Sequence, residues 1–212
     1  MRRLPVYMLL DTSTSMSGKP LNEVGAGLDL MVSTLRQDPY ALETAFLSII
    51  TFDDVAAQVV PLTELMDFQA PELKARGLTA LGRALEKVTD CVGNEVEKTT
   101  ATTKGDWKPL VFLMTDGSPT DDWEKALPAF EANRPGLVVG CGAGSGANLD
   151  VLKRFCDVVV ELDNMDKATM SEFFKWVSAS VTTSSKRIDL SKEEPGAQDL
   201  PPPPAGITLH KN

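Results

Sequence analysis

Residues 6–15, "VYMLLDTSTS", decide how this chain is expected to fold. The five apolar residues 6–10 are typical of a strand that is covered on both faces of a sheet. The run ends at Asp11, and hydroxyl side chains follow at Ser13 and Ser15. Because side chains two residues apart on extended backbone point the same way, we expect Asp11, Ser13 and Ser15 to converge on one point.

The rest of the chain alternates strand-like and helix-like segments. Asp53-Asp54 separates two adjoining strand-like runs and predicts a hairpin at one edge of the sheet. The alternation predicts a doubly wound α/β fold, with a mostly parallel central sheet, one antiparallel edge strand and helices on both faces. The expected strands are 6–10, 45–52, 56–62, 109–115, 137–141 and 158–162, and the expected helices are 21–35, 79–92, one that starts near Asp121, about 148–156, and 170–181.

The composition divides the chain into a domain, 1–183, and an extended proline-rich tail, 184–212. The length of 212 residues and the apolar share of 42% are sufficient for a proper core. The tail lacks a clear helical or strand period until its last apolar residues, and "PPPP" at 201–204 favours polyproline II.

The charge and the cysteine content limit which partners this protein is expected to bind and in which cellular compartment it is expected to work. The net charge of −9 argues against nucleic acid and anionic membranes, which bind through lysine and arginine. The apolar run "LPVYMLL" is too short for a signal peptide, and no stretch approaches the length of a membrane-spanning helix. Three cysteines without a CxxC pair are expected to be buried free thiols, so we expect a cytoplasmic protein.

The expected functional site lies at the carboxyl ends of the strands, where open α/β sheets bind ligands. A second strand ends in Asp116, and Thr79 precedes a helix at the same rim. Two carboxylates and three hydroxyls suit a hard divalent cation, Mg²⁺ first with Mn²⁺ or Ca²⁺ as alternatives, and do not suit zinc or copper. The expected metal ligands are Asp11, Ser13, Ser15, Thr79 and Asp116. Because the hydroxyls are neutral, the cation can accept a further carboxylate or phosphate from a partner.

The same residues carry a family resemblance that spans roughly residues 5–182. D-x-S-x-S, the threonine of "GLTAL" and a strand ending in "TDG" resemble the von Willebrand factor A (vWA) domain, a Rossmann-like fold, and its metal-ion-dependent adhesion site (MIDAS). "VFLMTDGSPTDDW", "GCGAGSGANLDVLK" and the proline-rich end make the whole chain similar to bacterial tellurite-resistance (TerY-type) proteins. The resemblance implies that the three hydroxyls bind the metal directly or nearly so, and the two aspartates directly or through water. It also implies stress-response partners that include protein kinases and phosphatases.

Simpler interpretations of single residues remain open. The DTSTS segment alone would fit a turn that caps a helix, and Thr79 alone would fit an N-cap. Asp53 and Asp54 fit a hairpin turn, and Asp121 and Asp122 fit acids at a helix start. The glycine-rich segment 140–148 is expected to be a tight connection beside the metal rim, because it lacks the position of a dinucleotide fingerprint.

The leading functional hypothesis is a non-enzymatic, metal-dependent protein-binding module. The alternative is a Mg²⁺-dependent phosphatase or phosphotransferase that uses Asp11. Such a site normally has an acid or base two residues on, where this chain has Ser13. A hydrolase triad is disfavoured because the chain has one histidine, His210, in the tail. A structural module that does not use metal is the third hypothesis, and the complete set of five ligands argues against it.

Overall fold

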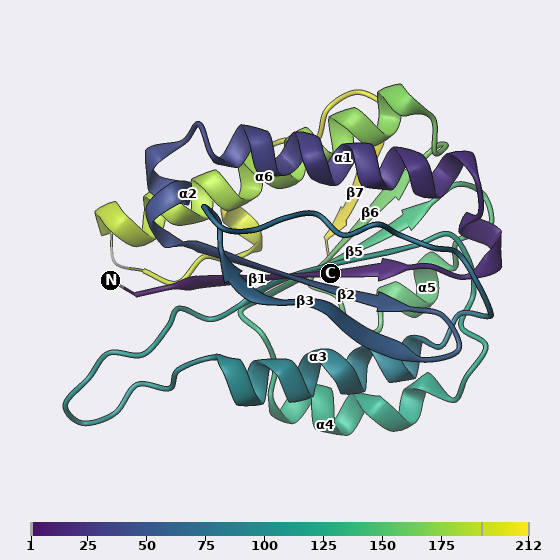
Figure 1. Ribbon diagram of the computed structural model, residues 1–212. Coiled ribbons are helices and arrows are strands. Elements are labelled where there is room, and N and C mark those ends of the chain that lie inside the picture. Colours follow the sequence, from purple (N-terminus) through teal and green to yellow (C-terminus); the bar gives the residue numbers. More distant parts are fainter. Residues whose placement is uncertain (1, 192, 212) are drawn as a thin grey trace.

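The computed structural model describes residues 2–191 and 193–211 as seven strands with helices on both sides (Figure 1). The strands are β1 (Leu4–Asp11), β2 (Ala45–Phe52), β3 (Ala56–Glu64), β4 (Leu110–Thr115), β5 (Leu137–Ala143), β6 (Val158–Leu162) and β7 (Ile207–Lys211). The helices are α1 (Lys19–Leu35), α2 (Pro39–Thr44), α3 (Leu81–Glu95), α4 (Leu127–Ala132), α5 (Leu149–Leu152) and α6 (Lys167–Ser191), with short 3-10 turns η1 (Thr14–Met16), η2 (Trp123–Ala126) and η3 (Ala197–Asp199).

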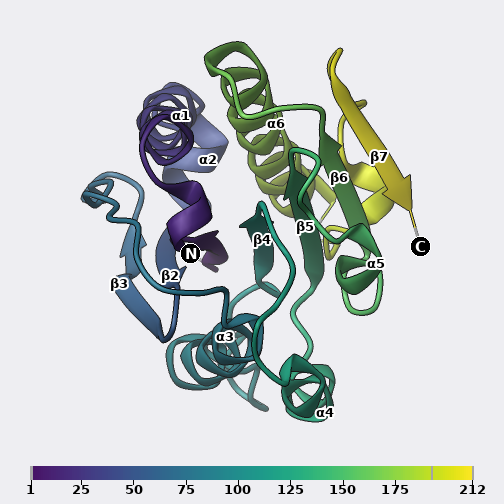
Figure 2. The same ribbon diagram turned by 90° about the vertical axis from the view of Figure 1, so that its right-hand side faces the viewer.

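The strand order is β3-β2-β1-β4-β5-β6-β7, and the central strands run parallel. The predicted hairpin is confirmed, because β2 and β3 pair antiparallel at one edge. From β1 the chain adds β2 and β3 on one side of the sheet and then β4 and the later strands on the other side. The loops after β1 and β4 therefore leave the same rim on either side of a topological switch point. Figure 2 looks onto this rim. The predicted doubly wound α/β fold is therefore confirmed.

Two hydrophobic layers hold the sheet between the helices. Val6, Met8 and Leu10 of β1 face the layer beneath α1, α2 and α6, and Tyr7 and Leu9 face the layer above α3 and α4 (Figure 1). Every residue of β1 is buried, which explains why its sequence is a continuous apolar run and not an alternating one. Asp11 continues the side of Tyr7 and Leu9, so its carboxyl group projects toward the α3 side of the sheet.

Within residues 184–191 and 193–211, the structure differs from the expected extended tail. Helix α6 continues to Ser191, because Ser184 and Ser185 are buried and Ile188 completes the apolar stripe one turn later. The serines hide the helical period in the sequence, since small polar residues can fill buried helix positions without looking apolar.

The last described residues form a second antiparallel edge strand, where one was expected. β7 pairs with β6, with Leu209 opposite Val160 and Ile207 opposite Leu162. The connection before it lies against α6, where the Trp176 indole N–H donates to the Pro201 carbonyl over 2.9 Å. A five-residue strand gives too short an alternation to be recognised without its partner strand.

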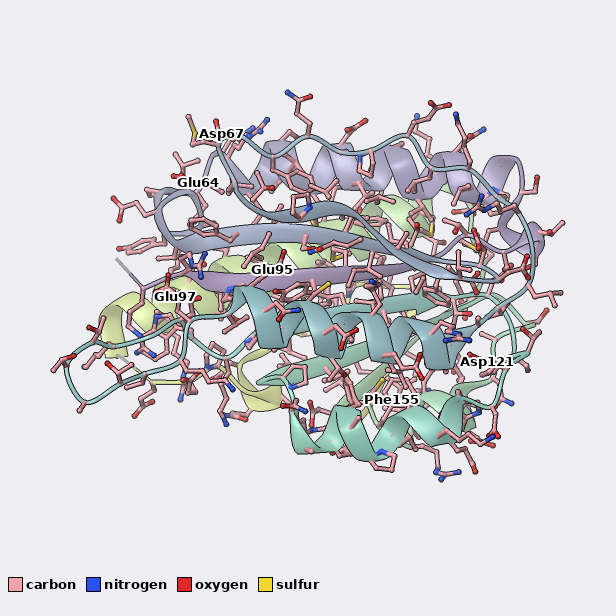
Figure 3. All side chains as sticks on the ribbon, turned by 60° about the horizontal axis from the view of Figure 1, so that its bottom comes forward. Glu64, Asp67, Glu95, Glu97, Asp121 and Phe155 are labelled. Carbon is pink, nitrogen blue, oxygen red and sulfur yellow. The ribbon has the colours of Figure 1, made fainter. Side chains whose placement is uncertain are left out.

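A partly buried polar network links β1 and β3 to the end of α3 that lies away from the rim. The Glu95 carboxylate accepts from the Tyr7 hydroxyl over 2.9 Å and from the Gln58 amide over 2.9 and 3.0 Å. Figure 3 labels Glu95 near one end of α3 and Asp121 near the other.

In the described ranges, no helix is both long and apolar enough to cross a membrane.

Candidate metal centre

The predicted site begins where β1 and β4 end side by side. Leu10 pairs with Met114 in parallel register, so the next residues along, Asp11 and Thr115, are neighbours on the same side of the sheet. Asp116 follows directly and is partly exposed at the rim. The strand pairing therefore brings the two predicted carboxylates to one rim.

Asp11 is fully buried, and both of its carboxylate oxygens are hydrogen-bonded. One oxygen accepts from the Ser13 backbone N–H over 2.8 Å, and the other accepts from the Thr115 hydroxyl over 2.6 Å. Burial raises the pKa of Asp11, and the nearby charge of Asp116 raises it further, while the hydrogen bonds from Ser13 and Thr115 oppose the shift. A divalent cation next to this carboxylate would offset the unfavourable burial of its charge.

A chain of hydrogen bonds joins the two serines to the second aspartate. The Ser13 and Ser15 hydroxyls are 3.0 Å apart, and the Ser15 hydroxyl donates to Asp116 Oδ1 over 2.7 Å. Ser13 is buried and Ser15 is exposed, so the chain runs from the interior to the surface. Together with the bond from Ser13 N–H to Asp11, these contacts connect four of the five predicted ligands.

Thr79 is brought to the same rim from the loop before α3. Its hydroxyl lies 3.9 Å from the point that a Cβ on Gly117 would occupy, next to Asp116. Its backbone N–H donates to the Thr120 hydroxyl over 3.1 Å, and its carbonyl accepts from Thr120 N–H over 2.9 Å. Thr79 is buried, with 6% of its surface exposed.

Sequence reasoning missed the residues that hold this loop in place. The Asp53 carboxylate accepts from Arg76 Nε over 2.6 Å, and the Asp53 carbonyl accepts from Ala80 N–H over 2.8 Å. The Gly77 carbonyl accepts from both the backbone N–H and the hydroxyl of Thr14, over 3.1 and 2.8 Å. The loop that carries Thr79 is thus tied both to the hairpin and to the D-x-S-x-S loop.

Thr115 is the other missed residue, and the sequence did contain a signal for it. It directly precedes Asp116, and once β1 and β4 are known to be neighbours its hydroxyl has to face Asp11. The pairing of the strands could not be read from the sequence, so the contact could not be predicted.

The remaining acidic and glycine-rich segments have structural roles. Asp53 and Asp54 form the hairpin turn, as predicted. Asp121 was predicted to start its own helix, but its carboxylate instead accepts from the Gly82 and Arg83 backbone N–H groups, over 3.1 and 3.2 Å, and so caps α3. Asp121 can cap α3 because the 117–122 loop folds back over the first turn of that helix.

The segment 140–148 lies beside the rim, as predicted. A Cβ on Gly146 would come within 2.8 Å of the Asp116 carbonyl oxygen, so the backbone there approaches as closely as a residue without a side chain allows. The glycine-rich segment therefore packs directly against the backbone of Asp116.

The donor set fits a small hard cation. Adjacent ligands in an octahedral shell with bonds of about 2.1 Å are about 3.0 Å apart. The two oxygen–oxygen distances of the serine chain, 3.0 and 2.7 Å, are hydrogen-bond distances that also lie close to that spacing. Among the described residues no group of three or more histidine, cysteine, aspartate or glutamate side chains could hold a metal, so a metal site here depends on the hydroxyls.

The sequence also matches a family model. The model of the von Willebrand factor type A domain matches residues 6–168, which include all five predicted ligands. The chain belongs to the vWA domain family. This family is a general protein-interaction module that contains a MIDAS in some of its members. No curated protein shows significant similarity to the chain.

Solved structures of similar fold come from bacteria and from mussel. A von Willebrand factor type A protein from Catenulispora acidiphila has 21% identity and a TM-score of 0.63, covering 86% of this chain and 43% of its own. The pilus adhesin SpaC from Lactobacillus rhamnosus GG has 12% identity and a TM-score of 0.65, covering 86% and 31%. Proximal thread matrix protein 1 from the mussel byssus, with a zinc-occupied MIDAS motif, has 19% identity and a TM-score of 0.56, covering 84% and 46%.

These similarities show the fold. The vWA chain spans less than half the length of each of the three structures. The zinc in the mussel protein belongs to a motif of the type expected here, whereas the oxygen ligands alone had argued against zinc.

Proposed function

We propose that this chain is a non-enzymatic protein-binding module whose MIDAS cation captures an acidic or phosphorylated group of a partner. The observation that carries the proposal is the hydrogen-bonded chain Asp11–Ser13–Ser15–Asp116, which reaches the surface at the rim. The Thr79 hydroxyl lies near Gly117, the residue after Asp116. Asp11 and Asp116 together only just balance a divalent charge, and the other three ligands are neutral hydroxyls. An open coordination position of the bound ion would therefore keep affinity for an outside anion.

In this proposal each of the five residues has its own role toward the cation. Asp11 supplies charge from the interior and is held in one orientation by Thr115. Ser13, Ser15 and Thr79 supply neutral oxygens, and Asp116 balances the charge at the surface. The cation supplies Lewis acidity toward the partner's oxygen. Mg²⁺ is the ion we put first, with Mn²⁺ and Ca²⁺ as alternatives, and the mussel relative adds zinc.

The binding role is favoured over the phosphatase or phosphotransferase alternative by the position of Ser13. An acid or base two residues after Asp11 would be needed for proton transfer, and the Ser13 hydroxyl instead lies 3.0 Å from the Ser15 hydroxyl. His210 lies on β7 and interacts with Glu161, 3.0 Å away, which leaves it without a link to Asp11.

The wider biological setting is also a proposal. The resemblance to TerY-type proteins supports a place in a tellurite-resistance or stress-response system, with a kinase or phosphatase as the partner. The three cysteines are buried thiols outside any disulfide, which supports a cytoplasmic location. The charge of −9 supports a protein partner over nucleic acid or membrane.

Calorimetric titration tests the metal site. We expect Mg²⁺, Mn²⁺ or Ca²⁺ to release or absorb heat with one site per chain, and Asp116→Ala to abolish the signal without unfolding. Asp29→Ala, an exposed carboxylate in the second half of α1, is the matched control and should bind as the wild type does. Equal heats for wild type and Asp116→Ala, or no heat with any of these ions or Zn²⁺, would contradict the proposal.

A further inference from the structure

Two large apolar side chains are exposed at the rim beside the candidate metal centre. Leu78 is 60% exposed and Val55 is 52% exposed. Leu78 lies between Gly77, whose carbonyl is bonded to Thr14, and Thr79, which is one of the five candidate ligands. Two further exposed aliphatic residues, Val59 and Met66, lie on β3 and beyond its far end.

The two rim residues are held on adjoining loops that hydrogen bonds fix in place. The Leu78 backbone N–H donates to Asp54 Oδ1 over 3.0 Å, and the Val55 backbone N–H donates to Asp53 Oδ1 over 3.1 Å. In Figure 2 the loop leading into α3 runs beside η1. An ordered loop that exposes apolar side chains has already met the conformational entropy cost of presenting them to a partner.

We propose that the partner is a protein segment in which the carboxylate that reaches the metal has an aliphatic residue within two positions of it. Leu78 and Val55 contact that aliphatic side chain. The inference rests on the proposed function of the metal site. It adds which kind of protein segment, one with an aliphatic residue next to its carboxylate, the site would select.

The charges around the two residues favour a carboxylate over a phosphate. A phosphate brings a charge of about −1.5 to −2, against −1 for a carboxylate. The Asp54 carboxylate is exposed and bonded to Leu78 N–H, and the neighbouring cation, Arg76, is already paired with Asp53 at 2.6 Å. A singly charged, partly apolar segment fits these surroundings better than a dianion.

The experiment presents two libraries of octapeptides to the immobilised full chain with Mn²⁺. One library has a central aspartate between random neighbours, and the other has phosphoserine in place of the aspartate. We expect Leu, Ile, Val and Met to be enriched about fivefold within two positions of the aspartate, as partial burial of one aliphatic side chain predicts. The enrichment should disappear in the Val55→Ser/Leu78→Ser variant and in Leu78→Ser alone. It should persist in Val59→Ser/Met66→Ser, the matched control of similar exposure.

The outcomes separate the two proposals. Capture that needs Mn²⁺ but shows no aliphatic enrichment, or the same enrichment in the rim variants, overturns this inference and leaves the metal-dependent function standing. Capture that requires phosphoserine in place of aspartate overturns the choice of a carboxylate. Capture that is the same in EDTA and in Asp116→Ala overturns the proposed function, and the inference with it.

Discussion

At the scale of single residues, the site combines a buried charge with the hydroxyls that stabilise it. The Asp11 carboxylate is out of contact with solvent, and its oxygens depend on Ser13 N–H and the Thr115 hydroxyl. Thr115 also accepts from Gly117 N–H over 3.3 Å, so one hydroxyl links the interior carboxylate to the turn that carries Asp116. Thr115 therefore acts as a positioning residue for the candidate site.

Thr115→Val tests this role. The substitution keeps the shape of the side chain but leaves a buried carboxylate oxygen without its donor, which costs about 1–3 kcal/mol of unfolding free energy. Denaturant unfolding of the metal-free protein measures the cost, and Mn²⁺ titration should show weaker binding. Thr63→Val, where the hydroxyl bonds locally to the Pro61 carbonyl, should change stability little. A Thr115→Val protein within about 0.5 kcal/mol of wild type would contradict the assignment.

At the scale of elements, α1 and α6 pack so closely that a glycine is required between them. A Cβ on Gly27 would come within 2.0 Å of the Phe174 ring, whereas a Cβ on Gly25 would meet no atom within 4 Å. Both glycines are interior residues of α1. The contact between these helices therefore depends on Gly27 and not on Gly25.

The two glycines make a matched pair of substitutions. Gly25→Ala should stabilise the protein by about 0.5–1 kcal/mol, because alanine loses less backbone entropy in a helix. Gly27→Ala should destabilise it, because overpacking costs about 1–3 kcal/mol and outweighs the helix gain. Thermal unfolding compares them directly. Equal shifts for the two variants would show that α1 and α6 are not packed as described.

Elements that depend on local pattern were predictable, and elements that depend on a distant partner were not. The apolar run of β1 and the Asp53-Asp54 turn predict a strand and a hairpin unaided. Helix α2 was not predicted, because an Asp-Pro pair directly after a helical pattern is typical of a helix end. Here the Asp38 carboxylate accepts from Ala41 N–H and caps the next helix. β7 was missed because its pairing partner, β6, is some 45 residues away in sequence.

At the scale of the whole molecule, the site too has a part that local sequence predicts and a part that depends on distant contacts. Asp11, Ser13 and Ser15 are close in sequence, and their spacing alone predicts that they converge. The proximity of Asp116 and Thr79 follows from the strand order and from the tie between the hairpin and the loop before α3. Thr115 belongs to the TDG motif, but its contact with Asp11 becomes visible only when the fold is known. The same holds for the bonds that Asp53 makes to the loop before α3.

The fold also buries all three thiols, and their burial predicts low reactivity toward thiol reagents. Burial raises the pKa of Cys91 to about 11, with the charge of Glu95 adding to the shift, and burial raises the pKa values of Cys141 and Cys156 as well. The native thiols therefore stay protonated at pH 8. We expect Ellman's reagent to label none of them in the folded protein and three in denaturant. Rapid labelling of the native protein would contradict the burial.

The same shifts set a dependence of stability on pH. A group whose pKa is higher in the folded state than in the unfolded state contributes stability below the unfolded value and loses it as pH rises. The unfolded thiols titrate near pH 9. Unfolding free energy should therefore fall as pH rises above about 9, and replacing Cys141 by alanine should reduce that slope. A slope unchanged by the substitution would show that Cys141 titrates equally in both states.

The most direct test of the central claim is an anomalous difference map from a crystal of the full chain soaked in Mn²⁺. The five-ligand site predicts one strong peak at the rim, within about 2.6 Å of the Ser13 and Ser15 hydroxyls. Thr79, Asp11 and Asp116 should be bound directly or through a single water. A peak elsewhere, or a rim peak with the Thr79 hydroxyl and Asp116 carboxylate both beyond the reach of one water, would contradict the claim.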